Sequence, residues 1–433
     1  MITKLGLERF KSFRNAELDI GPFTTLVGTN ASGKSNVRDA LRFLHGISRG
    51  YSLAEIIGEK WVEGGVLQWS GIRGGSREAA MGGSGTFAVS AEVALTFELG
   101  DPITMGGPVV YRIEVDPAPA LGARVVKESL YQDGTMLFDS HPGHEPPHQA
   151  DMEHVSVRLR PGGDYRKLPV KTLIASRPVI SQISERIAGR RDSGAKLIRS
   201  AVQHVIAALG SMRFLDLAPD AMRKPSLPGQ IVLGDRGENL SSVLQAICAD
   251  RAQKRSLLAW IQAVAPIDAA DLEFPEDTSG RILLHLVDSA GCRISATSAS
   301  DGTLRFLAIL AALRGPEPAG LYFVEELENG IHPTRVRLLL QLIEKTTAAG
   351  RTQVVATTHS PNLLGLISPA SQGHASVVYR AEEETESRIR SILELPDARR
   401  VVGNRGLAAL HAAGWLENAA SFDDAGEDEE AVA

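Results

Sequence analysis

The sequence predicts an α/β fold, because short apolar runs typical of buried strands alternate with segments whose apolar residues have helical spacing. Three strand-like runs carry this prediction, at residues 23–27, 321–324 and 353–358. Segments with apolar residues at helical spacing follow the first run and precede the second. Most candidate functional residues come directly after these three runs, and a further group precedes the second run.

The first strand-like run leads into a glycine-containing loop with the spacing of a phosphate-binding P-loop. Glycines let backbone N–H groups turn toward phosphate oxygens, Lys34 supplies a point charge for the β and γ phosphates, and the Ser35 hydroxyl can ligate Mg²⁺. The helical pattern that follows aims a helix N-terminus at the phosphates. We therefore predict nucleoside triphosphate binding. The candidate nucleotide-binding residues of this loop are Gly28, Asn30, Ala31, Ser32, Gly33, Lys34, Ser35 and Asn36.

Two carboxylates follow the second strand-like run, Leu321 to Val324. This pattern is typical of a Walker B segment, in which Glu325 is the metal-side carboxylate and Glu326 is the candidate general base. A general base must lie within hydrogen-bond reach of the attacking water, and a carboxylate one residue past the metal-side group can be placed there. The alternative is a solvated acidic turn.

A small polar stretch, residues 298–303, leads into a helical pattern of apolar residues. It predicts a capped helix start, and such an N-terminus presents free N–H groups that suit a γ-phosphate presented by another subunit. The candidate residues are Ser300, Asp301 and Gly302. A helix cap without any ligand is the alternative.

His359 follows the third strand-like run, Gln353 to Thr358. Its position after a predicted strand and downstream of the two carboxylates favours a γ-phosphate sensor. A surface histidine with a structural hydrogen bond is the alternative.

Together these motifs resemble the ABC-type ATPase heads, and more narrowly the bacterial predicted AAA-family ATPases related to RecF, the chromosome-maintenance ATPases and the overcoming-lysogenization-defect proteins. The resemblance covers most of the chain and implies an α/β P-loop NTPase of ABC-ATPase-head type with a β-rich insertion and a helical insertion. The motifs that carry it are Asn-x-Ser-Gly-Lys-Ser-Asn, Ser-x-Ser-Asp-Gly-Thr-Leu-Arg-Phe, Val-Glu-Glu-x-Glu-Asn-Gly-x-His-Pro and Thr-Thr-His-Ser-Pro.

The resemblance also implies roles for the candidate residues. Lys34 and the loop amides hold the phosphates of ATP, Ser35 and Glu325 organise Mg²⁺, and Glu326 activates water. Residues 300–302 complete the site of a second protomer in trans, so that two copies form a homodimer around ATP. His359 contacts the γ-phosphate, residues 329–332 form a dimer-facing loop, and residues 11, 12 and 14 lie near the base or ribose unless they are plain solvated surface.

Several positions depart from the transporter ATPases. Glu325 replaces the usual Asp, the signature has Asp301 and Gly302 where two glycines are common, and His332 stands where many heads carry Asp. These departures disfavour the energy subunit of a transporter. Gln68, in a Gly-rich stretch, is the sole candidate for the glutamine loop, and a chance glutamine is the alternative.

Composition bounds the function classes. The 433 residues include two cysteines, Cys248 and Cys292, which excludes a disulfide framework and a Cys-rich zinc site. No long apolar run occurs at the start, so we expect no signal peptide, no membrane span and a cytoplasmic location.

The order of motifs predicts a head interrupted by inserts. Residues 1–50 and 275–395 form the two parts of the ATPase head. Residues 51–175 form a β-rich lobe, including an antiparallel region at 88–97 and 109–115. Residues 176–274 form a helical insertion without a long coiled-coil arm. Residues 396–433 form a C-terminal segment that ends in a disordered acidic tail.

The net charge of −6 gives no general attraction for nucleic acid. Basic segments occur at 158–167 and 186–191, with Lys196 and Arg199 following, and clustered Lys and Arg side chains can track phosphates. Ordinary solvated faces explain them as well. DNA as a partner is therefore implied more by the resemblance than by charge.

We expect an ATPase that switches between open and ATP-closed dimers, in DNA repair or in defence against phage and other foreign DNA. No toprim-like acidic cluster follows the head, so a nuclease or a small toprim-like companion would act in trans. Two alternatives remain open: a regulatory module that gates a partner by ATP occupancy without hydrolysis, and a transporter energy subunit.

Overall fold

The computed structural model describes residues 1–95, 107–118, 122–140, 153–160, 170–264, 269–380 and 385–421. The chain divides into two compact units. The first consists of Met1–Ile20, Thr29–Met212 and Val378–Arg390, and the second of Gly21–Gly28, Arg213–Val377 and Ser391–Ala433. The five segments expected from the sequence follow other boundaries, since segments 1–50, 176–274 and 275–395 each contribute to both units, and they remain a prediction.

The first unit contains an antiparallel sheet of eight strands with the order β11-β10-β9-β8-β7-β6-β1-β2. Strands β6 and β7 pair antiparallel, as expected for the regions 88–97 and 109–115, although β6 ends at Val93. Residues 96 and 97 lie outside the described residues. Strands β1 and β2 continue the same sheet. The strand bounds are β1 (Ile2–Phe10), β2 (Phe13–Asp19), β6 (Phe87–Val93), β7 (Val109–Asp116), β8 (Arg124–Gln132), β9 (Thr135–Asp139), β10 (His154–Leu159) and β11 (Val170–Ile174).

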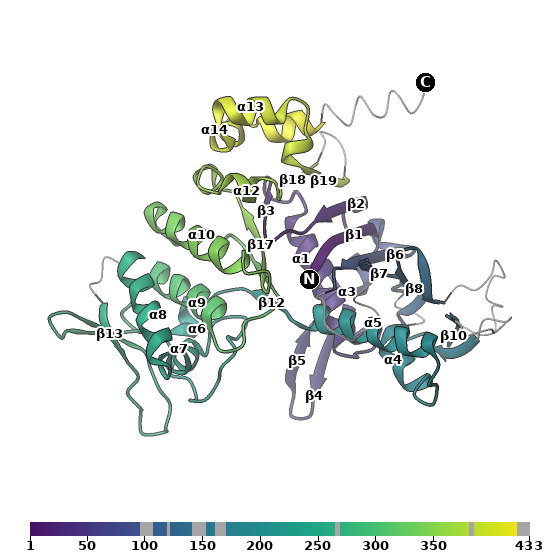
Figure 1. Cartoon of the computed structure of the whole chain (residues 1–433), viewed down its shortest axis with the longest axis horizontal. Helices are drawn as coiled ribbons and strands as arrows, with labels where there is room; N and C mark the ends of the chain where they lie inside the picture. The colour runs from purple at the N-terminus through teal and green to yellow at the C-terminus, as the bar shows by residue number, and fades with distance from the viewer. Residues whose placement is uncertain are drawn as a thin grey trace. The chain divides into compact units, whose positions relative to one another are not determined.

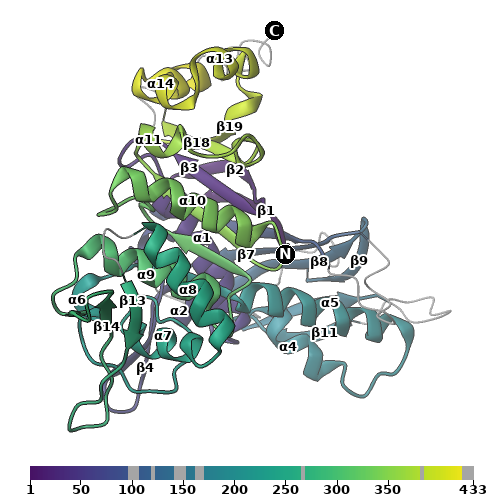
Figure 2. The ribbon, with the colours of Figure 1, turned by 60° about the vertical axis from the view of Figure 1, so that its left-hand side comes forward.

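The helices of the first unit pack on this sheet through apolar side chains. Phe43 of α1 and Phe10 of β1 both meet the ring of Phe87 edge-on, at centroid separations of 5.4 and 5.3 Å. Helices α4 and α5 lie next to each other beside β8 and β9 (Figure 2). The remaining elements are α1 (Lys34–Ser48), α2 (Leu53–Ile57), β4 (Glu59–Val62), β5 (Val66–Ser70), α3 (Gly75–Ala79), η1 (Met81–Gly83), α4 (Val179–Arg186), α5 (Ser193–Gly210) and β19 (Ser387–Ser391).

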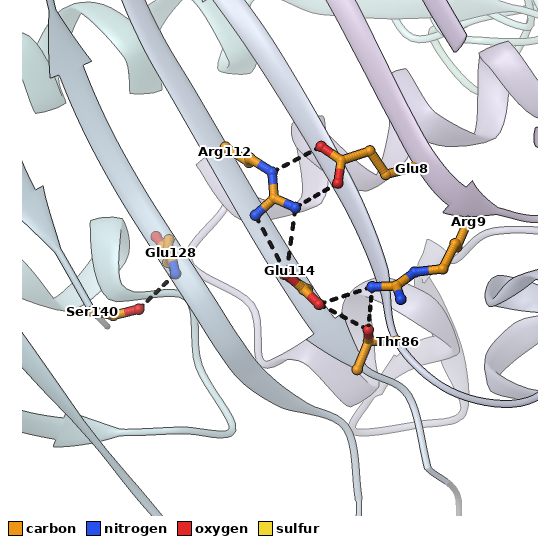
Figure 3. A network of polar contacts seen from close by, with 7 residues as sticks. All are labelled: Glu8, Arg9, Thr86, Arg112, Glu114, Glu128 and Ser140. Carbon is orange, nitrogen blue, oxygen red and sulfur yellow. Dashed lines mark hydrogen bonds and ion pairs between the residues drawn. The ribbon is translucent and has the colours of Figure 1, made fainter. Parts of the chain in front are cut away.

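Charged side chains form a network across three neighbouring strands of the sheet (Figure 3). Arg112 of β7 reaches over β6 to Glu8 of β1, with 2.6 Å between Nη2 and Oε2. Arg9 bridges from β1 to Glu114 at 3.0 Å and donates to Thr86 at 2.8 Å. The guanidinium of Arg112 lowers the pKa of the Glu8 carboxyl. The opposite charges therefore support the pairing of β1, β6 and β7.

A buried carboxylate, Glu128 of β8, connects this sheet to α4. The side chain has no exposed surface and accepts hydrogen bonds from the Tyr111 hydroxyl at 3.0 Å and from the N–H groups of Val179 and Ile180 at 2.6 and 2.7 Å. It thus satisfies two of the free N–H groups at the start of α4. Burial nevertheless raises its pKa to about 7 and outweighs these hydrogen bonds, which act in the opposite direction.

The second unit is built on a sheet with the order β12-β16-β17-β3-β18. Strands β16, β17, β3 and β18 run parallel where they pair. Three of them confirm the strand-like runs that predicted the α/β fold, and every residue of β16, β17 and β3 is buried. The bounds are β3 (Phe23–Val27), β12 (Met212–Leu215), β16 (Leu321–Val324), β17 (Gln353–Thr358) and β18 (Ala375–Arg380).

Helix α10 lies beside β17 and β3, and α7, α8 and α9 pack together (Figure 1). The apolar face predicted at Leu240, Val243, Leu244 and Ile247 is buried in α7. The elements are α6 (Pro219–Met222), α7 (Leu240–Cys248), α8 (Arg251–Val264), β13 (Ala269–Glu273), β14 (His285–Asp288), β15 (Arg293–Ser295), α9 (Asp301–Arg314), α10 (Pro333–Thr347), α11 (Pro361–Leu364), α12 (Pro369–Gln372), η2 (Ile392–Glu394), α13 (Ala398–Arg405) and α14 (Leu407–Ala412).

Two expectations fall on parts of the chain outside the described residues. The acidic tail from residue 422 onward lies there, as do residues 161–167 of the first basic segment. In the second basic segment, Arg190 pairs with Asp192 at 2.8 Å, and Arg199 donates to the Arg190 carbonyl at 2.8 Å. Across the part of the chain that the structure describes, none of the helices has the length and apolar character needed to cross a membrane.

Candidate functional site

The carboxyl ends of three parallel strands meet at one edge of the second unit's sheet. Val324 of β16 pairs with Ala356 of β17, and Thr358 of β17 pairs with Val27 of β3. Gly28, Glu325 and His359 follow directly after these strands. The start of the P-loop, the carboxylates and the histidine therefore leave the same edge of the sheet, which is where open α/β sheets bind ligands.

The rest of the P-loop, from Thr29, belongs to the first unit and has the backbone of a tight turn. Ala31 and Gly33 have φ of 63° and 116°, and Gly33 is the N-cap of α1. A Cβ at Gly33 would lie 2.8 Å from the Ser387 hydroxyl. Both the positive φ and the lack of room for a side chain therefore require glycine at this position. The Lys34 ammonium donates to the Thr29 carbonyl at 2.7 Å across the loop.

Buried charges hold the start of α1 behind the loop. Asp39 has no exposed surface and pairs with Lys11 at 2.6 Å and with Arg73 at 3.2 Å, while Arg73 also donates to the Ser35 carbonyl. Lys11, which the resemblance places near the base or ribose, thus makes a buried ion pair. Asn36 donates to the Ser12 hydroxyl at 2.8 Å. These contacts fix the first turn of α1.

The turn after β16 presents the two carboxylates differently. Glu325 is half-buried, and its Oε1 is a buried atom without a hydrogen-bond partner among the described residues. Glu326 is exposed and has φ of 48°, a left-handed conformation that costs a non-glycine residue energy and is often found at functional sites. Its N–H donates to the Thr357 hydroxyl at 2.9 Å, and its carboxylate accepts from Asn329 at 3.2 Å.

The signature segment forms the capped helix that its sequence predicts. Ser300 is the N-cap of α9 and accepts from the Thr303 N–H at 3.3 Å. Asp301 pairs with Arg223 at 2.5 Å, and Arg223 also donates to the Ala299 carbonyl. Gly302 is buried against the turn that follows Glu326, because a Cβ there would overlap the carbonyl oxygen of Gly330.

The segment around His359 contacts two other parts of the second unit. Glu328 Oε1 accepts from the Thr358 hydroxyl at 2.8 Å and from the His359 N–H at 3.2 Å. On the other side, His411 of α14 lies 3.4 Å from the His359 carbonyl oxygen. The candidate sensor is therefore held by its backbone.

Sequence reasoning missed several of these partners. Thr357 and Glu328 lie inside quoted motifs, which was a usable signal, but no role was assigned to them. Arg223 lies far along the chain from Asp301, and no sequence pattern indicated that the two residues pair. Gln68 lies in β5 with an exposed side chain, not in a loop. His332 is the N-cap of α10.

Comparison with known proteins identifies similar domains. A family model described as "AAA domain, putative AbiEii toxin, Type IV TA system" matches residues 23–365. Curated relatives include structural maintenance of chromosomes protein 4 of Dictyostelium discoideum, 50% identical over 50 residues, which are 11% of this chain and 4% of that protein. Structural maintenance of chromosomes protein 1 of Schizosaccharomyces pombe is 36% identical over 70 residues, 16% of this chain and 6% of the relative. The matches thus span a small fraction of these relatives.

Solved structures similar to this chain include two chromosome-maintenance heads. The head domain from Thermotoga maritima is 14% identical, with a TM-score of 0.42, over 90% of this chain and 98% of that one. The head domain from Pyrococcus furiosus, solved with an extended coiled coil and bound to the C-terminal domain of ScpA, is 12% identical, with a TM-score of 0.47, over 93% and 98%.

Proposed function

We propose that this chain, which belongs to the AAA-domain family described as "putative AbiEii toxin, Type IV TA system" and has an ABC-type ATPase head, binds ATP with Mg²⁺ and hydrolyses it. The family match confirms the predicted fold class, an α/β P-loop NTPase. The observation that carries the proposal is the edge of the sheet at which Gly28, Glu325 and His359 follow β3, β16 and β17.

Glu325 at this edge fits a divalent cation. Glu325 Oε1 is buried without a hydrogen-bond partner among the described residues, and a buried carboxylate oxygen of this kind calls for an ion or an ordered water. Carboxylate and hydroxyl oxygens are ligands that Mg²⁺ accepts, so Glu325 and Ser35 would hold it. The bound ion would neutralise charge on the β and γ phosphates.

The remaining roles belong to side chains of the chain itself. Lys34 and the amides of residues 28–36 bind the phosphates, with Lys34 exchanging its Thr29 carbonyl for phosphate oxygens. Glu326 holds the attacking water and accepts its proton, since its carboxylate is exposed and its backbone is fixed by Thr357. His359 contacts the γ-phosphate.

The signature residues would act on a second copy. Ser300 and Asp301 are exposed at the N-terminus of α9, where free N–H groups and the helix dipole favour an anion. We therefore propose that ATP closes a homodimer in which residues 300–302 of one protomer complete the site of the other, and that hydrolysis reopens it.

The output would be a conformational signal to an effector. The chromosome-maintenance names of the relatives support a role that involves DNA. Within that role, our proposal is defence against foreign DNA or DNA repair, with a nuclease or toprim-like companion as the partner in trans. We place this function in the cytoplasm.

Turnover of ATP by the purified protein tests the proposal. Wild type should release phosphate with Mg²⁺, and Glu326→Gln should lower kcat by about 10²-fold or more while ATP still binds. Lys34→Ala should lose ATP binding itself. If wild type binds ATP but does not hydrolyse it, with or without double-stranded DNA, the protein acts by ATP occupancy and not by hydrolysis.

A further inference from the structure

The turn after β16 is joined to the end of β17 by four hydrogen bonds. Two involve Thr357, whose carbonyl accepts from the Leu327 N–H at 3.2 Å and whose hydroxyl accepts from the Glu326 N–H at 2.9 Å. The other two end on a single side-chain atom, Glu328 Oε1, which accepts from Thr358 and His359. Glu328 is therefore the side chain of the turn after β16 that reaches the segment of His359.

We propose that Glu328 is a positioning residue for His359. Its carboxylate fixes the backbone N–H of His359 and the hydroxyl of the preceding residue, and so sets the direction in which the imidazole leaves the strand. This inference rests on the proposed ATP hydrolysis, in which His359 contacts the γ-phosphate.

The chemistry of the contact favours a positioning role over direct catalysis. Glu328 Oε1 already accepts two donors, at 2.8 and 3.2 Å, so that it has little remaining capacity for a substrate group. Hydrogen bonds to an ionised acceptor are stronger than neutral ones, which suits a contact that must keep one geometry. The contact with Glu328 is made by the backbone N–H of His359 and not by its ring.

The second carboxylate oxygen of Glu328 lowers the stability of the folded state. Glu328 Oε2 is buried and lacks a hydrogen-bond partner within the described part of the chain. A buried carboxylate oxygen without a donor destabilises the folded state. If the carboxylate served only to join two turns, a neutral side chain would join them at a lower cost, so the cost indicates a use at the site.

The alternative is a purely structural contact, and three substitutions separate the roles. Glu328→Ala removes both hydrogen bonds, whereas Glu328→Gln keeps an acceptor oxygen with the same shape. Thr358→Val removes one donor and leaves the His359 N–H contact in place. We expect Glu328→Ala to lower kcat by about 10-fold or more, with the KM for ATP changing less than about threefold. Glu328→Gln and Thr358→Val should lower kcat by a smaller factor.

A double-mutant cycle with His359→Ala identifies the path of the effect. If Glu328 acts through His359, then Glu328→Ala should cost nothing further once His359 is alanine. Additive losses of kcat in the double variant would overturn the proposal, as would an unchanged kcat in Glu328→Ala.

Hydrogen exchange separates this proposal from the proposed function, because it needs no turnover. In the nucleotide-free protein, the amide of His359 should exchange about tenfold or more faster in Glu328→Ala than in wild type, and Glu328→Gln should largely restore protection. Unchanged exchange would overturn the positioning role. Absent turnover in wild type would overturn the proposed hydrolysis, while the exchange rates would still decide whether Glu328 holds His359.

Discussion

Replacing Glu128 by glutamine should remove a pH dependence of stability from the first unit. Glu128 is fully buried, and burial raises its pKa from 4.5 to about 7. The folded state therefore keeps the proton between these values, whereas the unfolded chain has released it. Because the folded state binds more protons there, the free energy of unfolding falls as pH rises through this window.

The size of the effect follows from the two pKa values. A tenfold change in an equilibrium constant is about 1.4 kcal/mol, so the interval between 4.5 and about 7 corresponds to about 3 kcal/mol in total. Most of this contribution to the free energy of unfolding, about 2 to 3 kcal/mol, should be lost between pH 5 and pH 8. Glu128→Gln keeps an oxygen acceptor for the start of α4 and has no proton to lose, so its stability should lack this fall.

Urea unfolding at several pH values, followed by circular dichroism, measures the effect. Glu8→Gln is the matched control on the same sheet, because Arg112 lowers the pKa of Glu8 and this carboxyl is ionised in both states above pH 6. The free energy of unfolding of this control should fall with rising pH as that of wild type does. An equal fall in Glu128→Gln, or a wild type whose stability rises from pH 5 to pH 8, would refute the reasoning.

Two further predictions concern the start of α9. Gly302→Ala should lower the free energy of unfolding by about 1 to 3 kcal/mol, because the new Cβ overlaps the backbone oxygen of Gly330. The control is Gly403→Ala, since Gly403 is helical and has open space around it, and this variant should keep its stability. Equal urea midpoints for the two variants would contradict the prediction. Ser300→Ala should cost about 1 kcal/mol through loss of the helix cap, while Ser300→Asp should retain the cap; an unchanged midpoint in Ser300→Ala would show that the cap is not needed.

The fold class and the local motifs could be predicted because they depend on short stretches of chain. The run at 321–324 is apolar throughout, the runs at 23–27 and 353–358 mix apolar residues with threonine, which is β-branched and favours strands, and the structure buries all three as strands. The helix after Lys34 and the capped start of α9 likewise follow from local spacing.

What could not be predicted depends on pairing between distant segments. Strands β1 and β2 join the sheet of β6 to β11, which no local pattern specifies. The contact of Glu328 with His359 depends on the register of β16 against β17. Arg223 reaches Asp301 across 78 residues of sequence, so neither residue could suggest the other.

The mass of Glu326→Gln in solution tests the ATP-driven switch most directly. With Mg²⁺ and ATP, light scattering should show a stable dimer for this variant, because closure occurs and hydrolysis does not. With ADP it should show a monomer, and wild type should return from dimer to monomer as ATP is consumed. A mass that does not change with nucleotide in either protein would contradict the account.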